Sequence, residues 1–411
     1  MPLTRGGAAL IEQGLVSGAH LLAFVLFARA LPASTWGVFG MAHAIVLFAQ
    51  GFQRAWVTIP MIPYSAGGSG WASQRPAWLA RHSLLLLAAL LLLGAASAGA
   101  AAARAGWLVQ SLALSTLLAA PLLVQEFARR AAVQEARWRL LAAMGCLYAV
   151  TLLAATLALR GQLAAGAWAP TLAMSLAAGA SALLYAATAR LPLLSLPART
   201  AQAPHQPPAG YRQYGAWATL CHLGHAGYNF GVQAMLAAWS GPAAVGAFHA
   251  CRTLVQPVAT LAGALDGIDK PQAAAALAAQ GPAAMRRVLR RSSGLAMLLA
   301  VPYLLGVALA AAPLLQWLYA ERYAGQGPAV WLWCLVAMCS LLAQPVESGL
   351  YVARRTRTLF QVRTVAALAS LTTAAALVPA HGTPGALASM ALGFALAATL
   401  GALSLRRLAP S

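Results

Sequence analysis

The chain has 411 residues, of which 61% are hydrophobic and only 8% charged, and its net charge at pH 7 is +20. Its mean hydropathy of +0.71 excludes an ordinary soluble globular domain and is typical of an all-α polytopic membrane protein. In a soluble protein the excess of arginine would suggest nucleic acid as a partner, but no basic stripe with interleaved aromatic residues lies outside the apolar segments, so nucleic-acid binding is not expected.

Twelve apolar runs are long enough to cross a bilayer, which takes about 20 residues. The first resembles a signal peptide in having Arg5, an apolar stretch and an Ala-Arg-Ala site, but Glu12 and Gln13 interrupt it, so we expect it to be retained as a span. In chain order the predicted spans are 8–31, 37–60, 80–103, 107–128, 140–160, 168–190, 212–238, 243–264, 292–313, 328–351, 359–379 and 384–405.

The distribution of basic residues predicts the orientation of these spans. The termini and even-numbered loops hold 22 of the 27 lysines and arginines, and the odd-numbered loops hold four. Because basic residues gather in cytoplasmic loops, both termini are predicted to be cytoplasmic. The remaining basic residue is Arg252, which lies inside the eighth span.

A proline-rich segment between the sixth and seventh spans, at 191–211, predicts a cytoplasmic linker between two six-helix lobes at 1–190 and 212–411. Within the second lobe, 265–291 is predicted to be a cytoplasmic amphipathic connector. Its basic residues are expected to meet anionic lipid headgroups. They are Arg286, Arg287, Arg290 and Arg291.

The two halves also resemble each other. The tripeptide at 37–39, Gly-Val-Phe, matches Gly-Ala-Phe at 246–248, an offset of 209 residues. Because both halves begin on the same side, the repeat predicts a pseudo-two-fold axis along the membrane normal and a central cavity between the lobes.

Polar residues on two faces of the seventh and eighth spans are the candidate binding groups. At 100° per residue each set occupies one helical face, and an arginine at bilayer depth costs about 2.5 to 3.5 kcal/mol unless it faces water or a partner. We therefore expect these faces to line the cavity, although Arg252 has the alternative of pairing with Glu347 or a carbonyl. The two sets are His222, His225, Asn229 and Gln233, and His249, Arg252, Gln256 and Thr260.

The second span adds Gln50 and Arg54 as candidates, although Arg54 is also placed for snorkelling to the interface. The acidic residues Glu347 and Glu12 are candidates for coupling transport to an ion. As alternatives, Glu347 pairs with Arg354 or Arg355, and Glu12 caps the first helix. Glu126 is interpreted as an interfacial ion pair with Arg129 and Arg130 at helical spacing.

No metal or cofactor is predicted. His222 and His225 lie one turn apart, but no third ligand accompanies them. The five cysteines lie in apolar stretches without metal-ligand spacing, and disulfides are not expected.

Two stretches carry a family resemblance: EQGLVSGAHLLAFVLFARALPASTWGVFGMAHAIVLFAQGFQRAWVTIP and AAWSGPAAVGAFHACRTLVQPVATLAGALDGI. With twelve spans in two halves, they resemble the polysaccharide translocases, or Wzx-like flippases, of the multidrug/oligosaccharidyl-lipid/polysaccharide exporter superfamily. The resemblance implies two lobes around a cationic cavity, with that role carried to Arg252 and Arg54.

The same resemblance implies ion-coupled movement of an undecaprenyl-diphosphate-linked oligosaccharide, an O-antigen or exopolysaccharide unit, across the bacterial inner membrane, and no enzymatic activity. The implied partners are the lipid-linked glycan, membrane lipids, H⁺ or Na⁺, and polysaccharide assembly proteins. A multidrug exporter of the same superfamily and a membrane glycan polymerase or ligase remain alternatives.

Overall fold

The computed structural model describes residues 5–61, 70–189, 194 and 211–407, and nearly all of these residues are helical. Nine helical segments among them are long and apolar enough to cross a membrane. When two long helices are divided at their glycine breaks, the described helices account for all twelve predicted spans. The predicted class, an all-α polytopic membrane protein, is therefore confirmed.

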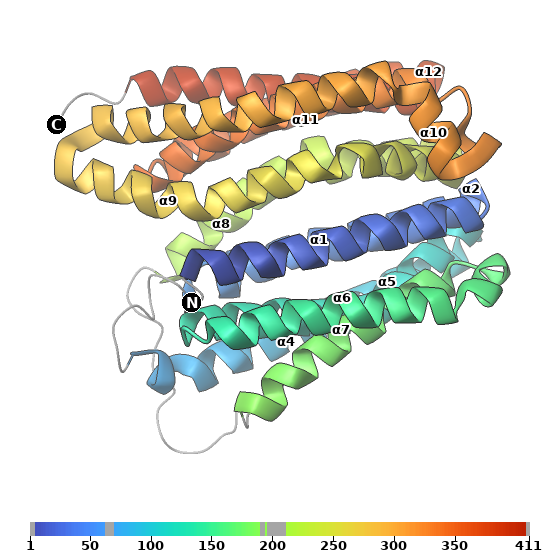
Figure 1. The fold of residues 1–411 in the computed structure, drawn as a ribbon, viewed down its shortest axis with the longest axis horizontal. Helices are drawn as coiled ribbons and strands as arrows, with labels where there is room; N and C mark the ends of the chain where they lie inside the picture. Colours follow the sequence, from blue (N-terminus) through green and yellow to red (C-terminus); the bar gives the residue numbers. More distant parts are fainter. Residues whose placement is uncertain (1–4, 62–69, 190–193, 195–210, 408–411) are drawn as a thin grey trace. The chain divides into compact units, whose positions relative to one another are not determined.

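The first of two units comprises Met1–Leu31 and Val38–His222. In it α1 packs on α6, α6 on α7, α7 on α5 and α5 on α4, and these helices run alongside one another in Figure 1. Trp78, Phe127, Tyr185 and Tyr211 belong to its buried core. Its elements are α1 (Arg5–Ala30), α2 (Ala33–Gln53), the π-helical turn η1 (Arg54–Thr58), α4 (Gly70–Ala102), α5 (Gly106–Gln134), α6 (Trp138–Ala158), η2 (Arg160–Ala165), α7 (Trp168–Ala189) and the first part of α8 (Tyr211–Ala226).

The second unit comprises Pro32–Gly37 and Leu223–Ser411, so α2 begins in this unit and continues in the first. In it α11 packs against both α9 and α12, and α12 also packs against α9. The predicted linker at 191–211 lies almost wholly outside the described residues. The elements of the second unit are the π-helical turn η3 (Gly227–Gly231), α9 (Val232–Leu309), α10 (Ala311–Tyr319), η4 (Ala320–Tyr323), α11 (Gly327–Val352) and α12 (Thr356–Arg406).

Three glycines with positive φ divide the long helices into antiparallel spans. Gly241 and Gly281 interrupt α9 at φ of 77° and 78°, and Gly382 interrupts α12 at 54°. Only glycine adopts this region without a steric penalty, so the chain reverses direction at these residues. The predicted connector at 265–291 is helical on both sides of Gly281 and continuous with the helices of the eighth and ninth spans.

Two glycines allow helix backbones to touch within the second unit. A Cβ at Gly37 would overlap the carbonyl oxygen of Pro242, and a Cβ at Gly246 would overlap the carbonyl oxygen of Ala33. The contact is reciprocal, because the offset of 209 residues that relates Gly37 to Gly246 also relates Ala33 to Pro242. The crossing has the small-xxx-small pattern by which membrane helices approach closely.

The crossing predicts that Gly246→Ala destabilises the protein. The added methyl group has to displace a backbone carbonyl, a form of overpacking that typically costs about 1 to 3 kcal/mol. Thermal unfolding of the purified protein in detergent should show a lower melting temperature. Gly263→Ala, in the same helix but with no described atom near the new Cβ, is the matched control and should be neutral or stabilising. Equal melting temperatures for the two variants would contradict the crossing.

Candidate functional site

A cavity of about 90 Å³ lies inside the second unit. It is bounded by η3, α9, α11 and α12, which are also the elements that pack together in this unit. Most of its wall is apolar, with Phe394 and Met390 contributed by α12. The polar groups that line it are the side chains of Asn229, Arg252, Gln256, Ser340 and Trp333. A mostly apolar cavity with a few converging polar groups is the usual form of a ligand site.

Arg252 is the one charged side chain among the described residues that line this cavity. Its guanidinium carbon lies 5.9 Å from the centre of the Trp333 ring, over which the cation is weakly stabilised. No described residue makes an ion pair or hydrogen bond with its side chain. The alternative pairing of Arg252 with Glu347 is wrong, because Glu347 binds Arg363. Arg252 is therefore a half-buried cation that still has charge to compensate.

Of the predicted binding residues, the structure brings Asn229, Arg252 and Gln256 together in this cavity. Asn229 is placed there by the π-helical turn η3, whereas Arg252 and Gln256 lie one turn apart on α9. Three of the lining residues were therefore among those predicted from their shared helical faces. Trp333 was missed, because an aromatic residue in an apolar span has no distinguishing pattern.

The other predicted polar residues of the second unit pair with near neighbours. Gln233 and His249 are both buried, and their side-chain nitrogens lie 2.6 Å apart. His225 Nδ1 lies 2.9 Å from the Tyr228 hydroxyl. In the part of the chain that the structure describes, no three His, Cys, Asp or Glu side chains gather as metal ligands would.

Three predicted residues, His222, Gln50 and Arg54, belong to the first unit. His222 lies against Gly51, and its Nε2 is 3.0 Å from the carbonyl oxygen of Phe48. Its ring also contacts Phe48 and Phe52, so it fills space between α8 and α2. Gln50 is buried. Their predicted place in a cavity between the lobes stays a prediction.

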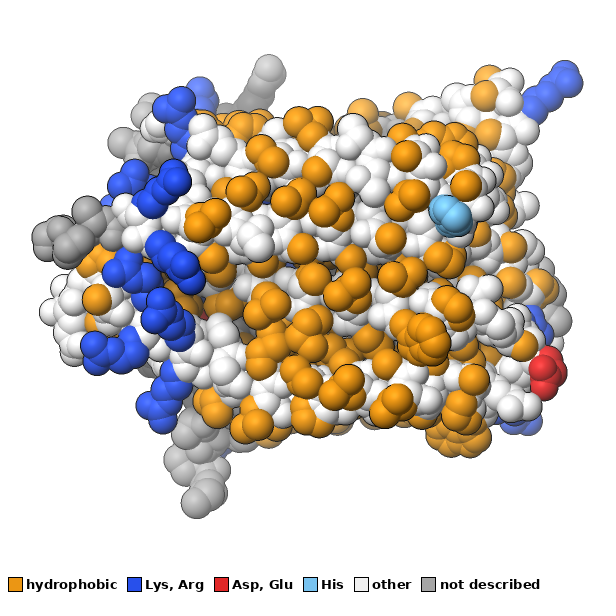
Figure 2. All heavy atoms as spheres, turned by 90° about the horizontal axis from the view of Figure 1, so that it is seen from above, with side chains coloured by type: hydrophobic (Ala, Val, Ile, Leu, Met, Phe, Trp, Pro, Cys, Tyr) orange, Lys and Arg blue, Asp and Glu red, His pale blue; other side chains and the backbone are white. Residues whose placement is uncertain are grey.

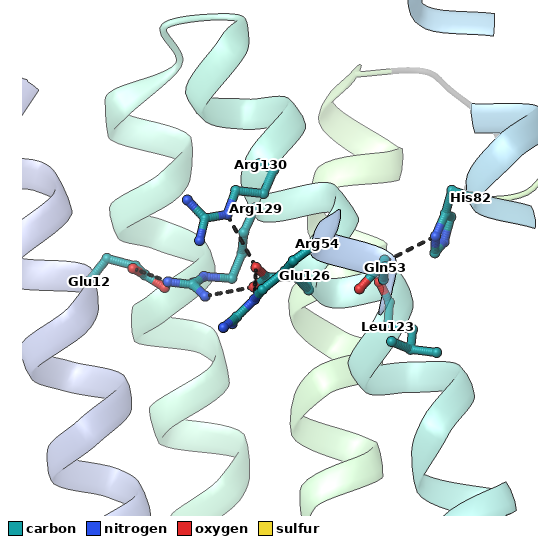
Figure 3. A network of polar contacts seen from close by, with 8 residues as sticks. All are labelled: Glu12, Gln53, Arg54, His82, Leu123, Glu126, Arg129 and Arg130. Atoms are coloured by element: carbon teal, nitrogen blue, oxygen red, sulfur yellow. Dashed lines mark hydrogen bonds and ion pairs between the residues drawn. The ribbon is translucent and has the colours of Figure 1, made fainter. Parts of the chain in front are cut away.

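A buried ion network joins α1, η1 and α5 in the first unit (Figure 3). Glu126, with only 1% of its surface exposed, is bound by Arg54 at 3.1 Å and by Arg130 at 3.2 Å, both on Oε1. Arg129 binds Glu126 Oε2 at 3.2 Å and Glu12 Oε1 at 2.6 Å. The predicted pairing of Glu126 with Arg129 and Arg130 is therefore confirmed.

The network also corrects two alternatives. Glu12 is buried against Arg129 and does not serve as a helix cap at the interface. Arg54 is bound to Glu126, so snorkelling to the interface does not by itself account for its position. The physical reason is common to both: a buried carboxylate needs an arginine beside it.

A second polar contact, which shares only α5 with the ion network, appears in Figure 3. Gln53 Nε2 donates to the carbonyl oxygen of Leu123 at 2.6 Å and lies 3.1 Å from Nδ1 of His82. The His82 ring stacks on Phe127, with the ring centres 4.6 Å apart. These contacts connect α2, α4 and α5 beside the ion network.

The charged pair of the second unit is Glu347 and Arg363. Arg363 donates Nη2 to Glu347 Oε2 at 2.5 Å and Nε to Oε1 at 3.2 Å, a bidentate arrangement. The Tyr228 hydroxyl lies 3.4 Å from Glu347 Oε1 and is also the partner of His225. The expected partners Arg354 and Arg355 were wrong, since both lie at the turn after α11, whereas Arg363 lies two turns into α12.

No protein-family model and no curated protein sequence matches this chain. Several solved structures are similar to it. An inward-facing multidrug resistance MATE family transporter of the MOP superfamily is 13% identical over 96% of this chain and 94% of its own, with a TM-score of 0.71. The lipid II flippase MurJ is 12% identical over 97% and 86%, with a TM-score of 0.67. This chain has the fold of the MOP superfamily transporters.

A third MOP-fold structure is a transporter from Pyrococcus furiosus for which a reversed polarity of the binding pocket suggests a different function. It is 14% identical over 98% of this chain and 95% of its own, with a TM-score of 0.65. The similar structures named here are two transporters and a flippase.

The Glu347 and Arg363 pair predicts a double-mutant result. Arg363→Met should strongly lower the melting temperature, because an uncompensated buried carboxylate costs about 3 to 5 kcal/mol. Adding Glu347→Gln removes that charge and should restore most of the loss. Arg357→Met, an exposed position on the same helix, is the control and should have little effect. Additive losses in the double variant would contradict a compensated pair.

Proposed function

We propose that this chain is a flippase that moves an undecaprenyl-diphosphate-linked oligosaccharide, an O-antigen or exopolysaccharide unit, across the bacterial inner membrane. The transporter fold supports movement across a membrane, and Arg252 supports an anionic substrate. The single observation that carries the proposal is the uncompensated guanidinium of Arg252 in a cavity whose described lining has no carboxylate.

The chemistry of the cavity suits a phosphorylated head group. A guanidinium binds two phosphate oxygens at once, and this interaction is strong where water is scarce. Asn229, Gln256 and Ser340 supply amide and hydroxyl groups that both donate and accept hydrogen bonds, as sugar hydroxyls require. The cavity's volume of about 90 Å³ admits only a small part of such a substrate, so the proposal concerns the phosphorylated head group.

A multidrug exporter is the second candidate because several proteins with this fold are multidrug transporters. Cationic drugs favour acidic groups in the cavity, and here the described lining is basic and polar. A glycan polymerase or ligase is less well supported, since it is an enzyme and the similar structures are transporters.

Coupling to an ion gradient is part of the proposal, with Glu347 as the leading group. Its carboxylate lies at the end of a chain of polar contacts that runs from His225 through the Tyr228 hydroxyl. Phe394, which lines the cavity, contacts both of those rings. Protonation of His225 or Glu347 would therefore change the charge close to the cavity that Arg252 lines. In this proposal both termini are cytoplasmic.

Arg252→Gln tests the function. The substitution keeps a polar hydrogen-bonding side chain and removes the charge, and because a hydrogen bond to a charged group is worth about 1.5 to 3 kcal/mol, lipid-linked oligosaccharide translocation should fall at least tenfold. The measurement is flipping of a fluorescent undecaprenyl-diphosphate oligosaccharide in proteoliposomes. Arg252→Lys should retain part of the activity, and Arg160→Gln, exposed in η2, should retain all of it.

Two results would overturn the proposal. Unchanged flipping by Arg252→Gln at equal protein incorporation would remove Arg252 from the site. If the wild-type chain moves cationic dyes and fails to move the lipid-linked glycan, the multidrug function replaces the flippase function.

A further inference from the structure

One end of the second unit carries a set of exposed arginines, here called the basic rim. In Figure 1 the Gly281 turn of α9 and the C-terminal end of α12 lie at the same end of this unit. Figure 2 shows basic side chains gathered there, next to a broad hydrophobic surface. None of these arginines forms an ion pair with a described carboxylate. The basic rim consists of Arg287, Arg290 and Arg291 on α9 and Arg357, Arg406 and Arg407 at the two ends of α12.

Many basic residues of the first unit have acidic or aromatic partners within that unit. Arg75 and Arg137 each lie 3.8 Å from Glu135. Arg81 lies over the rings of Trp78 and Tyr211. The arginines of the ion network have Glu126 and Glu12. The first unit therefore compensates many of its cations internally, whereas the basic rim has to obtain its anions from outside the described chain.

The position of the rim along its helices identifies where those anions lie. On α9, Arg287, Arg291, Leu295 and Leu299 are spaced four residues apart and share one face. Leu295 is 54% exposed and Leu299 is 63% exposed, so the same face changes from cationic to apolar within about 18 Å. On a membrane helix this change marks the boundary between headgroups and acyl chains.

The helix α12 repeats the pattern at both ends. Near its start Arg357 is followed by the exposed Val365 and Leu368, and near its end the exposed Leu403 precedes Arg407 by one turn. A soluble acidic partner would cover the arginines and leave the adjoining leucines in contact with lipid. A phospholipid contacts both at once, with its phosphate on the arginines and its acyl chains on the leucines.

We propose that the basic rim binds the phosphodiester groups of anionic glycerophospholipids in the adjoining leaflet. Arginine suits this role because two N–H groups of its guanidinium can donate hydrogen bonds to two phosphate oxygens at once. Clustered basic residues at a membrane surface also favour anionic over zwitterionic lipids. The inference concerns the annular lipid and does not depend on which substrate the protein transports.

The test uses the purified full-length protein in a neutral detergent. Phosphatidylglycerol is titrated against phosphatidylcholine, bound lipids are counted by native mass spectrometry, and melting temperatures are recorded. The wild type should retain about fivefold more phosphatidylglycerol than phosphatidylcholine, as expected for a polybasic surface. The triple variant Arg287→Gln, Arg291→Gln and Arg357→Gln should lose that preference. The matching triple substitution to lysine keeps the charge and should keep the preference.

Control substitutions Arg104→Gln and Arg160→Gln, both at exposed positions of the first unit, should leave the lipid preference unchanged. The proposal is overturned if the glutamine triple binds phosphatidylglycerol as the wild type does, or if the wild type does not distinguish the two lipids. It is also overturned if inorganic phosphate alone gives the same rise in melting temperature, since the rim would then be a site for a free anion. Displacement of phosphatidylglycerol by soluble polyglutamate would assign the rim to an acidic protein.

Discussion

A guanidinium held at bilayer depth needs a negative charge or a polar partner, and this requirement organises both units of the protein. In the first unit two buried carboxylates, Glu12 and Glu126, are held by arginines from η1 and α5. In the second, Glu347 is held by Arg363. Arg252 is the exception among these deep cations, because its described surroundings offer amides, a hydroxyl and an indole ring but no carboxylate. That imbalance separates Arg252 from the arginines whose charge is compensated by structural pairing, and it is the basis of the proposed binding role.

The helices can only bring these groups together if their backbones pack closely. Small residues permit this at the crossing of Gly37 and Gly246, where the missing side chain of each glycine leaves room for a backbone carbonyl oxygen of the other helix. Helices also pack closely at Gly224 and Gly227, where a Cβ would overlap atoms of Arg363 and Ala367 on α12. Arg363 is therefore positioned by a glycine on the neighbouring helix as well as by its ion pair with Glu347.

Much of the architecture was predictable from apolar length alone. All twelve spans are present as helices, and three glycines with positive φ mark reversals between them. Three residues predicted from their helical faces, Asn229, Arg252 and Gln256, line the cavity of the second unit. Two others on the same faces, Gln233 and His249, contact each other, and their binding role stays a prediction. A helical wheel gives the direction of a side chain from its axis and not the neighbour that it meets.

The sequence by itself determined that this is a helical membrane protein and where its spans lie, because a chain in lipid must satisfy its backbone hydrogen bonds within each helix. Only the tertiary structure decided which charges are compensated. The partners are remote in the chain, 72 residues apart for Arg54 and Glu126 and 117 for Glu12 and Arg129, and no local pattern encodes such distances. Arg252 and Arg363 differ because packing places a carboxylate beside Arg363 and leaves a cavity beside Arg252.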